Sequence, residues 1–444
     1  MGHVTAPSGQ WRGTTANGVT VHHGIRYARA ARFEQPRREP AHREVIDATI
    51  PGPVAPQLPS RLEAVMGAPA PLAQSEDCLT VTVTAPAGAD PGSCPVLVWL
   101  HGGAYLSGSG QWNLYAADRL VRETGIVVVA VGYRLGVLGY LEAPGISAGN
   151  LGLLDQITAL EWVRDNITAF GGDPARVTVS GQSAGAQSVV AMLGIERARA
   201  TFTQAIVQSA PLGLPFHGHD EAQRVAGVFL DELRGDPHRA DIADLLAAQD
   251  RTARRLAGPA ALNSAPPLLP VYDTDPLPAR RQWQDAVVRG ADGLRVLIGT
   301  TADEMEAFYG QHPVFSAVRR VPIVGPRLVA GVQQLVQHKV FDAPADRFAD
   351  LLTDAGADVR CFRFHRLHPS NPFGACHCIE LPLLFGSDEA WRDAPMLHPL
   401  SPDDAASIGA RTRRYWGEFV RSGDISDTTW PRHRTGSGSR HALP

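Results

Sequence analysis

The sequence predicts an α/β fold in which a central, mostly parallel, twisted sheet is flanked by helices. Continuous apolar runs recur along the chain, and stretches with helical spacing separate them. Pro95–Leu100 and Ile126–Val131 are apolar at every position, which is typical of strands covered on both faces. Strands that alternate with helices indicate parallel pairing through crossover helices.

The expected elements follow in chain order. Strands are rich in β-branched residues and are expected at 79–85, 95–100, 126–131, 177–180, 205–208, 295–299 and 359–364. Helices are expected at 113–123, 151–168 and 184–193. The second has apolar residues at helical spacing and ends before Gly171-Gly172, where two glycines favour termination.

The chain is long enough for two domains, but the strand–helix rhythm favours one domain over 1–433. Two segments, about 211–284 and 312–354, interrupt that rhythm with short helical stretches. We expect them to be helical excursions that cap the site. The Gly/Ser-rich end, Arg434–Pro444, is expected to be a flexible tail.

Composition excludes several classes of protein. The net charge is −4 and 19% of residues are charged, so there is no electrostatic case for binding nucleic acid or an anionic membrane. No signal peptide or membrane span is visible, and five irregularly spaced cysteines do not predict a disulfide framework. These observations favour a cytoplasmic location. Lys339 is the only lysine among 41 Lys and Arg residues, which indicates a GC-rich bacterial coding style.

The strongest motif is Gly181-x-Ser183-x-Gly185 in a strand-then-helix context. A sharp turn holds a serine hydroxyl exposed, and glycines two residues on either side avoid steric clashes in the bend. Such a bend positions a nucleophilic serine. The alternative, a flexible Gly-Ser loop, is disfavoured by the β-branched strand before it and the Ala-rich helix after it.

A second motif, His101-Gly-Gly-Ala-Tyr105, follows directly after an expected strand. Its small residues would let the N–H groups of Gly103 and Ala104 turn inward. With the N–H of Ala184 at the start of the following helix, they would form an oxyanion hole. An ordinary glycine-rich turn is the alternative.

A serine nucleophile needs a histidine base and a carboxylate that orients it. Asp303 and Glu304 both follow an expected strand, and local pattern does not separate them. His377 follows the last expected strand and completes the order serine, acid, histidine. The neighbouring Cys376 and Cys378 would project oppositely on a strand and lack a second ligand pair, so no metal is expected, and no cofactor.

These residues, with several other motifs in order, resemble the type-B carboxylesterase family. That family comprises α/β-hydrolases such as bacterial para-nitrobenzyl-type esterases and the cholinesterases. The motifs lie at 24–28, 75–79, 133–136, 150–156 and 170–174. The resemblance implies the α/β-hydrolase fold over nearly the whole chain.

The resemblance also implies roles for particular residues. It assigns Ser183 as nucleophile, Glu304 rather than Asp303 as the acid, and His377 as the base. It assigns the oxyanion donors to the backbone of three residues, Gly103, Ala104 and Ala184. It further implies that Arg134 pairs with Glu76 or Asp77.

Three departures from the family pattern matter. Gln182 precedes the nucleophile where many members carry Glu, so one buried negative charge is missing. Cys378 follows His377 where relatives more often have a small residue. The segment 56–75 has no aromatic residue to form a cation–π platform, so cholinesterase activity is not expected.

The predicted function is a serine carboxylesterase that hydrolyses small-molecule esters through an acyl-enzyme on Ser183, with water as the second substrate. A thioesterase, carbamate hydrolase or amidase could use the same residues. A catalytically silent binding protein is the alternative from another class, and it is disfavoured because every expected catalytic position is filled.

Overall fold

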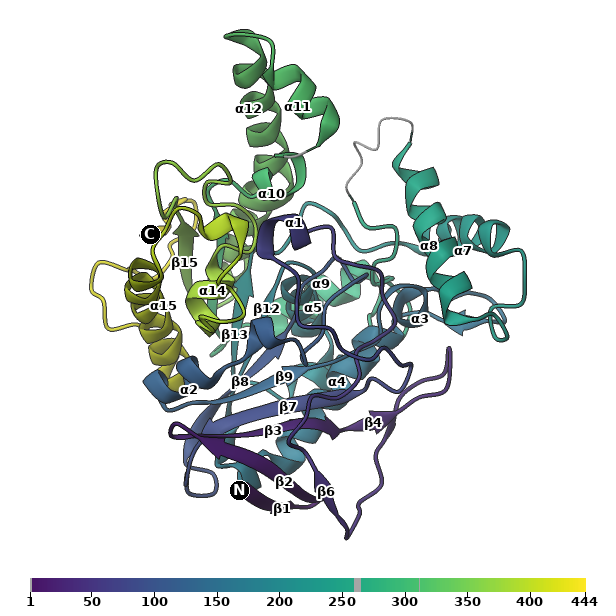
Figure 1. The fold of residues 1–444 in the computed structure, drawn as a ribbon, viewed down its shortest axis with the longest axis vertical. Coiled ribbons are helices and arrows are strands. Elements are labelled where there is room, and N and C mark those ends of the chain that lie inside the picture. The colour runs from purple at the N-terminus through teal and green to yellow at the C-terminus, as the bar shows by residue number, and fades with distance from the viewer. Residues whose placement is uncertain (1, 259–264, 311) are drawn as a thin grey trace.

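A large twisted sheet runs through the molecule (Figure 1), and the computed structural model describes it within residues 2–258, 265–310 and 312–444. Its strands lie in the order β1-β2-β3-β7-β9-β8-β12-β13-β14-β15-β16. Their bounds are β1 Gly2–Ala6, β2 Gly9–Ala16, β3 Val19–Arg26, β7 Thr80–Pro86, β8 Cys94–Leu100, β9 Val127–Val131, β12 Gly172–Gln182, β13 Gln204–Gln208, β14 Arg295–Thr301, β15 Asp358–Phe364 and β16 His441–Leu443.

The strands from β9 to β16 along this order are paired in parallel, so the predicted mostly parallel α/β sheet is confirmed. Each of the seven predicted strands is present. The antiparallel strands β1, β2 and β3 were not predicted, because they mix Thr, His and Arg with apolar residues and have no continuous apolar run.

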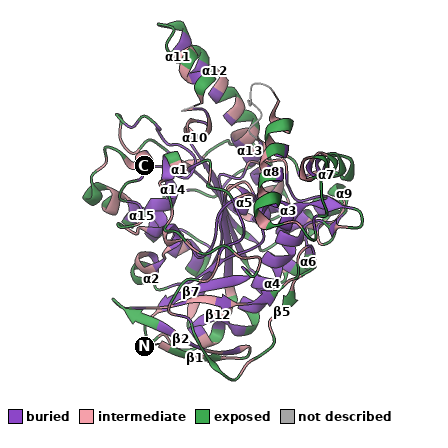
Figure 2. Cartoon of the chain, turned by 45° about the vertical axis from the view of Figure 1, so that its right-hand side comes forward, coloured by how far each residue is buried: buried purple, intermediate pink, exposed green. Residues whose placement is uncertain are grey.

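Helices cover both faces of the sheet. Along β8, Val96 and Val98 pack into one apolar cluster, and Leu97 and Trp99 into another. The first cluster includes side chains from α4, α5, α9 and α13, and the second includes side chains from α2, α14 and α15. Their bounds are α2 Asp118–Thr124, α4 Leu151–Asn166, α5 Ala184–Leu193, α9 Arg280–Arg289, α13 Ala343–Asp354, α14 Glu380–Phe385 and α15 Pro402–Ser422. Figure 2 shows the resulting buried centre.

The two segments that interrupt the rhythm are helical. The first contains α7 (His219–Leu233) and α8 (Ile242–Ala257), and its residues 259–264 lie outside the described part of the chain. The second contains α11 (Pro313–Arg319) and α12 (Val324–Gln337) before α13. In Figure 1, α11 and α12 stand out at the top of the view, and α7 and α8 lie at its upper right.

The C-terminal segment differs from the flexible tail that we expected. Its last strand, β16, pairs in parallel with β15, and Leu443 is 2% exposed. Arg440, just before it, pairs with Asp342 at 2.9 Å and Asp346 at 2.8 Å. Glycine and serine disfavour order only locally, whereas this segment gains partners from residues about a hundred positions away.

The partner of Arg134 also differs from the one that the resemblance implied. Its guanidinium pairs with the carboxylate of Asp155 on α4, at 2.7 Å and 2.8 Å, and both side chains are buried. Glu76 pairs with Arg32 at 2.5 Å, and Asp77 pairs with Arg26. The buried arginine takes the fully buried acid because a charge away from water needs a close partner. No described helix is both long and apolar enough to cross a membrane.

Candidate active site

Ser183 lies in a tight bend between β12 and α5. Its backbone is left-handed, with φ 55° and ψ −121°, a region that non-glycine residues seldom adopt. A Cβ atom on Gly181 would overlap the backbone of Gly185, and one on Gly185 would overlap the carbonyl oxygen of Leu100. The two glycines therefore allow the strand, the bend and the helix to pack closely, and the strained serine lies at the helix N-terminus.

His377 and Glu304 are brought together although 73 residues separate them. The Nδ1 atom of His377 lies 2.5 Å from Oε2 of Glu304, and both side chains are fully buried. The other carboxylate oxygen accepts the N–H of Thr301 at 2.8 Å. The rings of Phe308 and Phe341 lie 5.2 Å and 5.5 Å from the imidazole. The imidazole is thus held by one carboxylate and two aromatic rings.

Asp303, the alternative acid, has a different contact. Its Oδ2 atom accepts the N–H of Ala375 at 2.8 Å and lies 3.6 Å from Arg366. Of the two adjacent acids, Glu304 points at the imidazole, and Asp303 holds the loop that leads to His377.

Gln182 makes a contact that the sequence analysis missed. Its amide nitrogen lies 3.0 Å from Nε2 of His377, and both side chains are buried. Because Nδ1 faces a carboxylate, Nδ1 carries the proton, so the Gln182 amide donates to the Nε2 lone pair. Among the described residues, no hydrogen bond joins the Ser183 hydroxyl to His377. A substrate that aligns the serine with Nε2 must therefore displace this amide, in keeping with the tightening of such contacts in substrate complexes.

Three backbone N–H groups near Ser183 have no partner in the part of the chain that the structure describes. Within the described chain, none of the N–H groups of Gly103, Ala104 and Ala184 donates a hydrogen bond. Gly103 and Ala104 have φ values of 111° and 58°, so this loop is held in a left-handed conformation. A Cβ atom on Gly102 would lie 3.1 Å from the Ser183 Cβ, which places the loop against the serine. Ala184 is buried and Gly103 and Ala104 are half-buried, so these N–H groups are candidates to donate to an oxygen of a bound ligand.

Glu380, three residues after His377, is a second buried acid that the sequence analysis did not single out. One carboxylate oxygen accepts the Gln208 amide at 3.4 Å, and the other has no partner among the described residues. Burial, together with the nearby charge of Glu304, raises the pKa of Glu380 to about 7. The signal that could have found Glu380 is its spacing of three residues from the histidine.

We expect Glu380→Gln to stabilise the protein in alkaline solution. The pKa of Glu380 is higher in the folded protein than in the unfolded chain, so its ionised form destabilises the fold. This destabilisation begins above about pH 4.5 and is complete above about pH 7. The neutral amide removes this destabilisation. The free energy of unfolding of the variant should therefore exceed that of the wild type by about 3 kcal/mol near pH 8.5 and by almost nothing near pH 4.5. Urea unfolding of both proteins near pH 5.5 and pH 8.5 measures it. An equal difference at the two pH values would contradict the prediction.

Cys376 and Cys378 flank the imidazole as buried thiols. Burial raises the pKa of both well above the ordinary value, so both are protonated near neutral pH. Cys378 has a φ of 77°, a left-handed conformation that glycine adopts without strain.

Comparisons with known proteins agree on one family. A sequence model of the carboxylesterase family matches residues 2–316. The chain is 63% identical, over 441 residues, to a probable N-octanoylanthranilate hydrolase from Rhodococcus erythropolis, covering 99% of this chain and 97% of that protein. It is 32% identical to the para-nitrobenzyl esterase of Bacillus subtilis, covering 97% and 92%. The solved structure of a thermophilic PNB esterase superposes with a TM-score of 0.84 at 31% identity, covering 99% and 95%.

Proposed function

Because this chain belongs to the carboxylesterase family, we propose that Ser183, His377 and Glu304 are the catalytic group with which it hydrolyses carboxylic esters. One observation carries the assignment: the buried His377–Glu304 pair, at 2.5 Å, has its Nε2 atom 3.0 Å from the amide of Gln182, the residue that precedes Ser183. A carboxylate on Nδ1 fixes the tautomer in which Nε2 can accept a proton. The Ser183 proton is then transferred to His377 as the serine attacks the acyl carbon.

The oxyanion of the tetrahedral intermediate is bound by the N–H groups of Gly103, Ala104 and Ala184. Support comes from their lack of other partners among the described residues and from the left-handed loop that carries two of them. Each such donor contributes about 10²–10³ in rate. His377 next protonates the leaving group, and water hydrolyses the acyl-enzyme by the same steps.

We also propose that the natural substrate is an N-acyl aromatic amide with a medium-length acyl chain and a carboxylate on the ring. The Rhodococcus relative, 63% identical over nearly its whole length, is named for N-octanoylanthranilate, in which octanoic acid is bonded to the amino nitrogen of 2-aminobenzoate. The neutral Gln182 beside His377 is consistent with an anionic leaving group, because a glutamate there would repel it. Phe308 and Phe341 offer an aromatic surface next to the base.

A panel of octanoyl compounds tests the substrate class. We expect kcat/KM for N-octanoylanthranilate to exceed that for N-octanoylaniline, which lacks the carboxylate, by at least about tenfold, the effect of one charge-assisted hydrogen bond to the ring carboxylate. p-Nitrophenyl octanoate should be hydrolysed as well, because its leaving group needs no such contact. Hydrolysis of the ester with no cleavage of either amide would restrict the protein to esters, and a preference for the neutral anilide would contradict the role of the carboxylate.

We place the protein in the bacterial cytoplasm. All five cysteines are free thiols, which is usual in a reducing compartment, and the relatives named above with an organism come from bacteria.

A further inference from the structure

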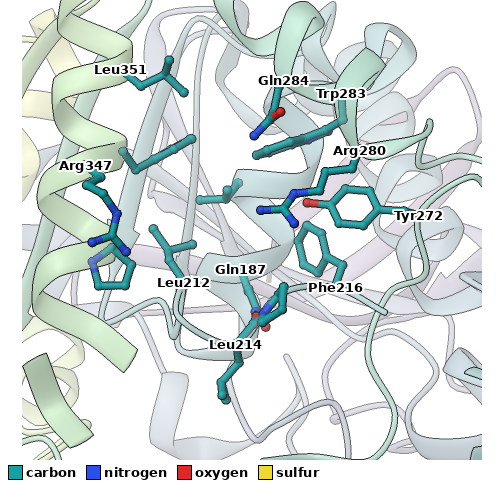
Figure 3. Close-up of a pocket in the computed structure, with 14 residues that line it drawn as sticks. Gln187, Leu212, Leu214, Phe216, Tyr272, Arg280, Trp283, Gln284, Arg347 and Leu351 are labelled. Atoms are coloured by element: carbon teal, nitrogen blue, oxygen red, sulfur yellow. The ribbon is translucent and has the colours of Figure 1, made fainter. Parts of the chain in front are cut away.

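A cavity of about 250 Å³ lies beside the nucleophile helix, between α9 and α13. Figure 3 shows its lining side chains converging from these helices and from the segment after β13. Its volume is just below the ~300–1,000 Å³ of pockets for drug-sized ligands, so it suits a smaller molecule.

The walls of this cavity are apolar and aromatic. Trp283 of α9 and Phe348 of α13 are stacked at 6.4 Å between ring centroids, and Phe216 packs edge-on against Trp283 at 6.4 Å. Leu212 and Leu351 complete the aliphatic part of the lining. Such walls favour an alkyl chain, because contact with it removes apolar surface from water.

The charged side chains that line the cavity are all cationic. Arg280 enters from α9, and Arg347 lies on the opposite side on α13, as Figure 3 shows. The lining contains no acidic residue, and neither guanidinium forms an ion pair with a described residue. The acids next to Arg347 point elsewhere: Asp346 binds Arg440 at 2.8 Å, and Asp350 binds His433 at 2.7 Å.

We propose that this cavity binds a monocarboxylate with a medium-length alkyl chain, the class of product that hydrolysis of an octanoyl substrate releases. The alkyl chain lies against Trp283 and Phe348, and the cation that binds the carboxylate is Arg280 on one side of the cavity or Arg347 on the other, since a guanidinium group pairs with a carboxylate in bidentate geometry. The choice of octanoate rests on the proposed function, whereas the charge and the apolar walls do not.

The cavity lies against the helix that directly follows Ser183. Gln187, one helical turn after Ser183 on α5, lines it and donates its amide to the carbonyl oxygen of Leu214 at 2.7 Å. Four residues of helix correspond to about 6 Å, so a ligand here contacts the helix that carries Ser183 without occupying the oxyanion site.

The test is calorimetric titration of sodium octanoate into protein whose Ser183 has first been sulfonylated with phenylmethylsulfonyl fluoride and checked by intact mass. We expect saturable binding to one site. Replacing both cavity arginines (Arg280→Gln with Arg347→Gln) should weaken that binding at least tenfold. The matched control removes the same charge from two exposed α9 arginines outside the cavity (Arg281→Gln with Arg289→Gln) and should change the Kd less than about twofold.

Each alternative result overturns part of the proposal. Equal loss in the two double variants, or no binding, would remove the site. Equal affinity for octan-1-ol would remove the role of the arginines, and binding of 2-aminobenzoate in place of octanoate would overturn the alkyl-chain assignment. Failure of the sulfonyl group to attach would contradict the assignment of Ser183 as the catalytic serine, not the cavity. Octanoate binding would still be measurable on the unmodified protein.

Discussion

Replacing Ser183 by alanine should lower kcat for p-nitrophenyl octanoate by a factor of about 10³ or more, with a much smaller change in KM. The variant loses the covalent acyl-enzyme and keeps only the binding and oxyanion contributions. The bend tolerates alanine because the hydroxyl of the half-buried serine makes no hydrogen bond to a described residue. Steady-state kinetics at equal protein concentration measure the effect, and circular dichroism checks that the fold is retained.

The matched control is Ser188→Ala, five residues later on the same helix. Ser188 is fully buried and its hydroxyl donates to Tyr105 at 3.4 Å, so its loss affects packing but not the reaction. Its kcat should stay within about tenfold of the wild-type value. Equal losses in the two variants would contradict the assignment of Ser183 as nucleophile.

Glu304→Gln should lower kcat by about 10⁴ while leaving the fold intact, because an amide oriented towards Nδ1 favours the wrong imidazole tautomer. The 2.5 Å contact and the full burial of both groups leave no room for water to replace the carboxylate. The kcat of wild type and variant on p-nitrophenyl octanoate near pH 8 gives the comparison.

Asp303→Asn is the control for this second prediction, since it changes the adjacent acid by the same single atom. Its carboxylate binds the N–H of Ala375 and does not contact the imidazole, so kcat should fall less than about tenfold. A loss in Asp303→Asn as large as in Glu304→Gln would show that the two acids act together.

Much of the candidate site could be predicted because its parts are local. The strand, glycines and helix around Ser183 are neighbours in sequence, and the same is true of the glycine-rich loop at Gly103. The choice between Asp303 and Glu304 could not be made from neighbouring residues in the sequence. Two adjacent acids look alike in a sequence, and they differ only in which one points towards His377, 73 residues further on.

Hydrophobic periodicity and turn residues were sufficient to specify the α/β class, the seven strands that were expected and the bend at Ser183, since these depend on contacts within a few residues. Tertiary packing decided the partner of Arg134, the order in the C-terminal segment and the contact of Gln182 with His377. Each of these joins side chains or strands that are distant along the chain. Burial and charge select such partners, and both arise only once the sheet has brought the segments together.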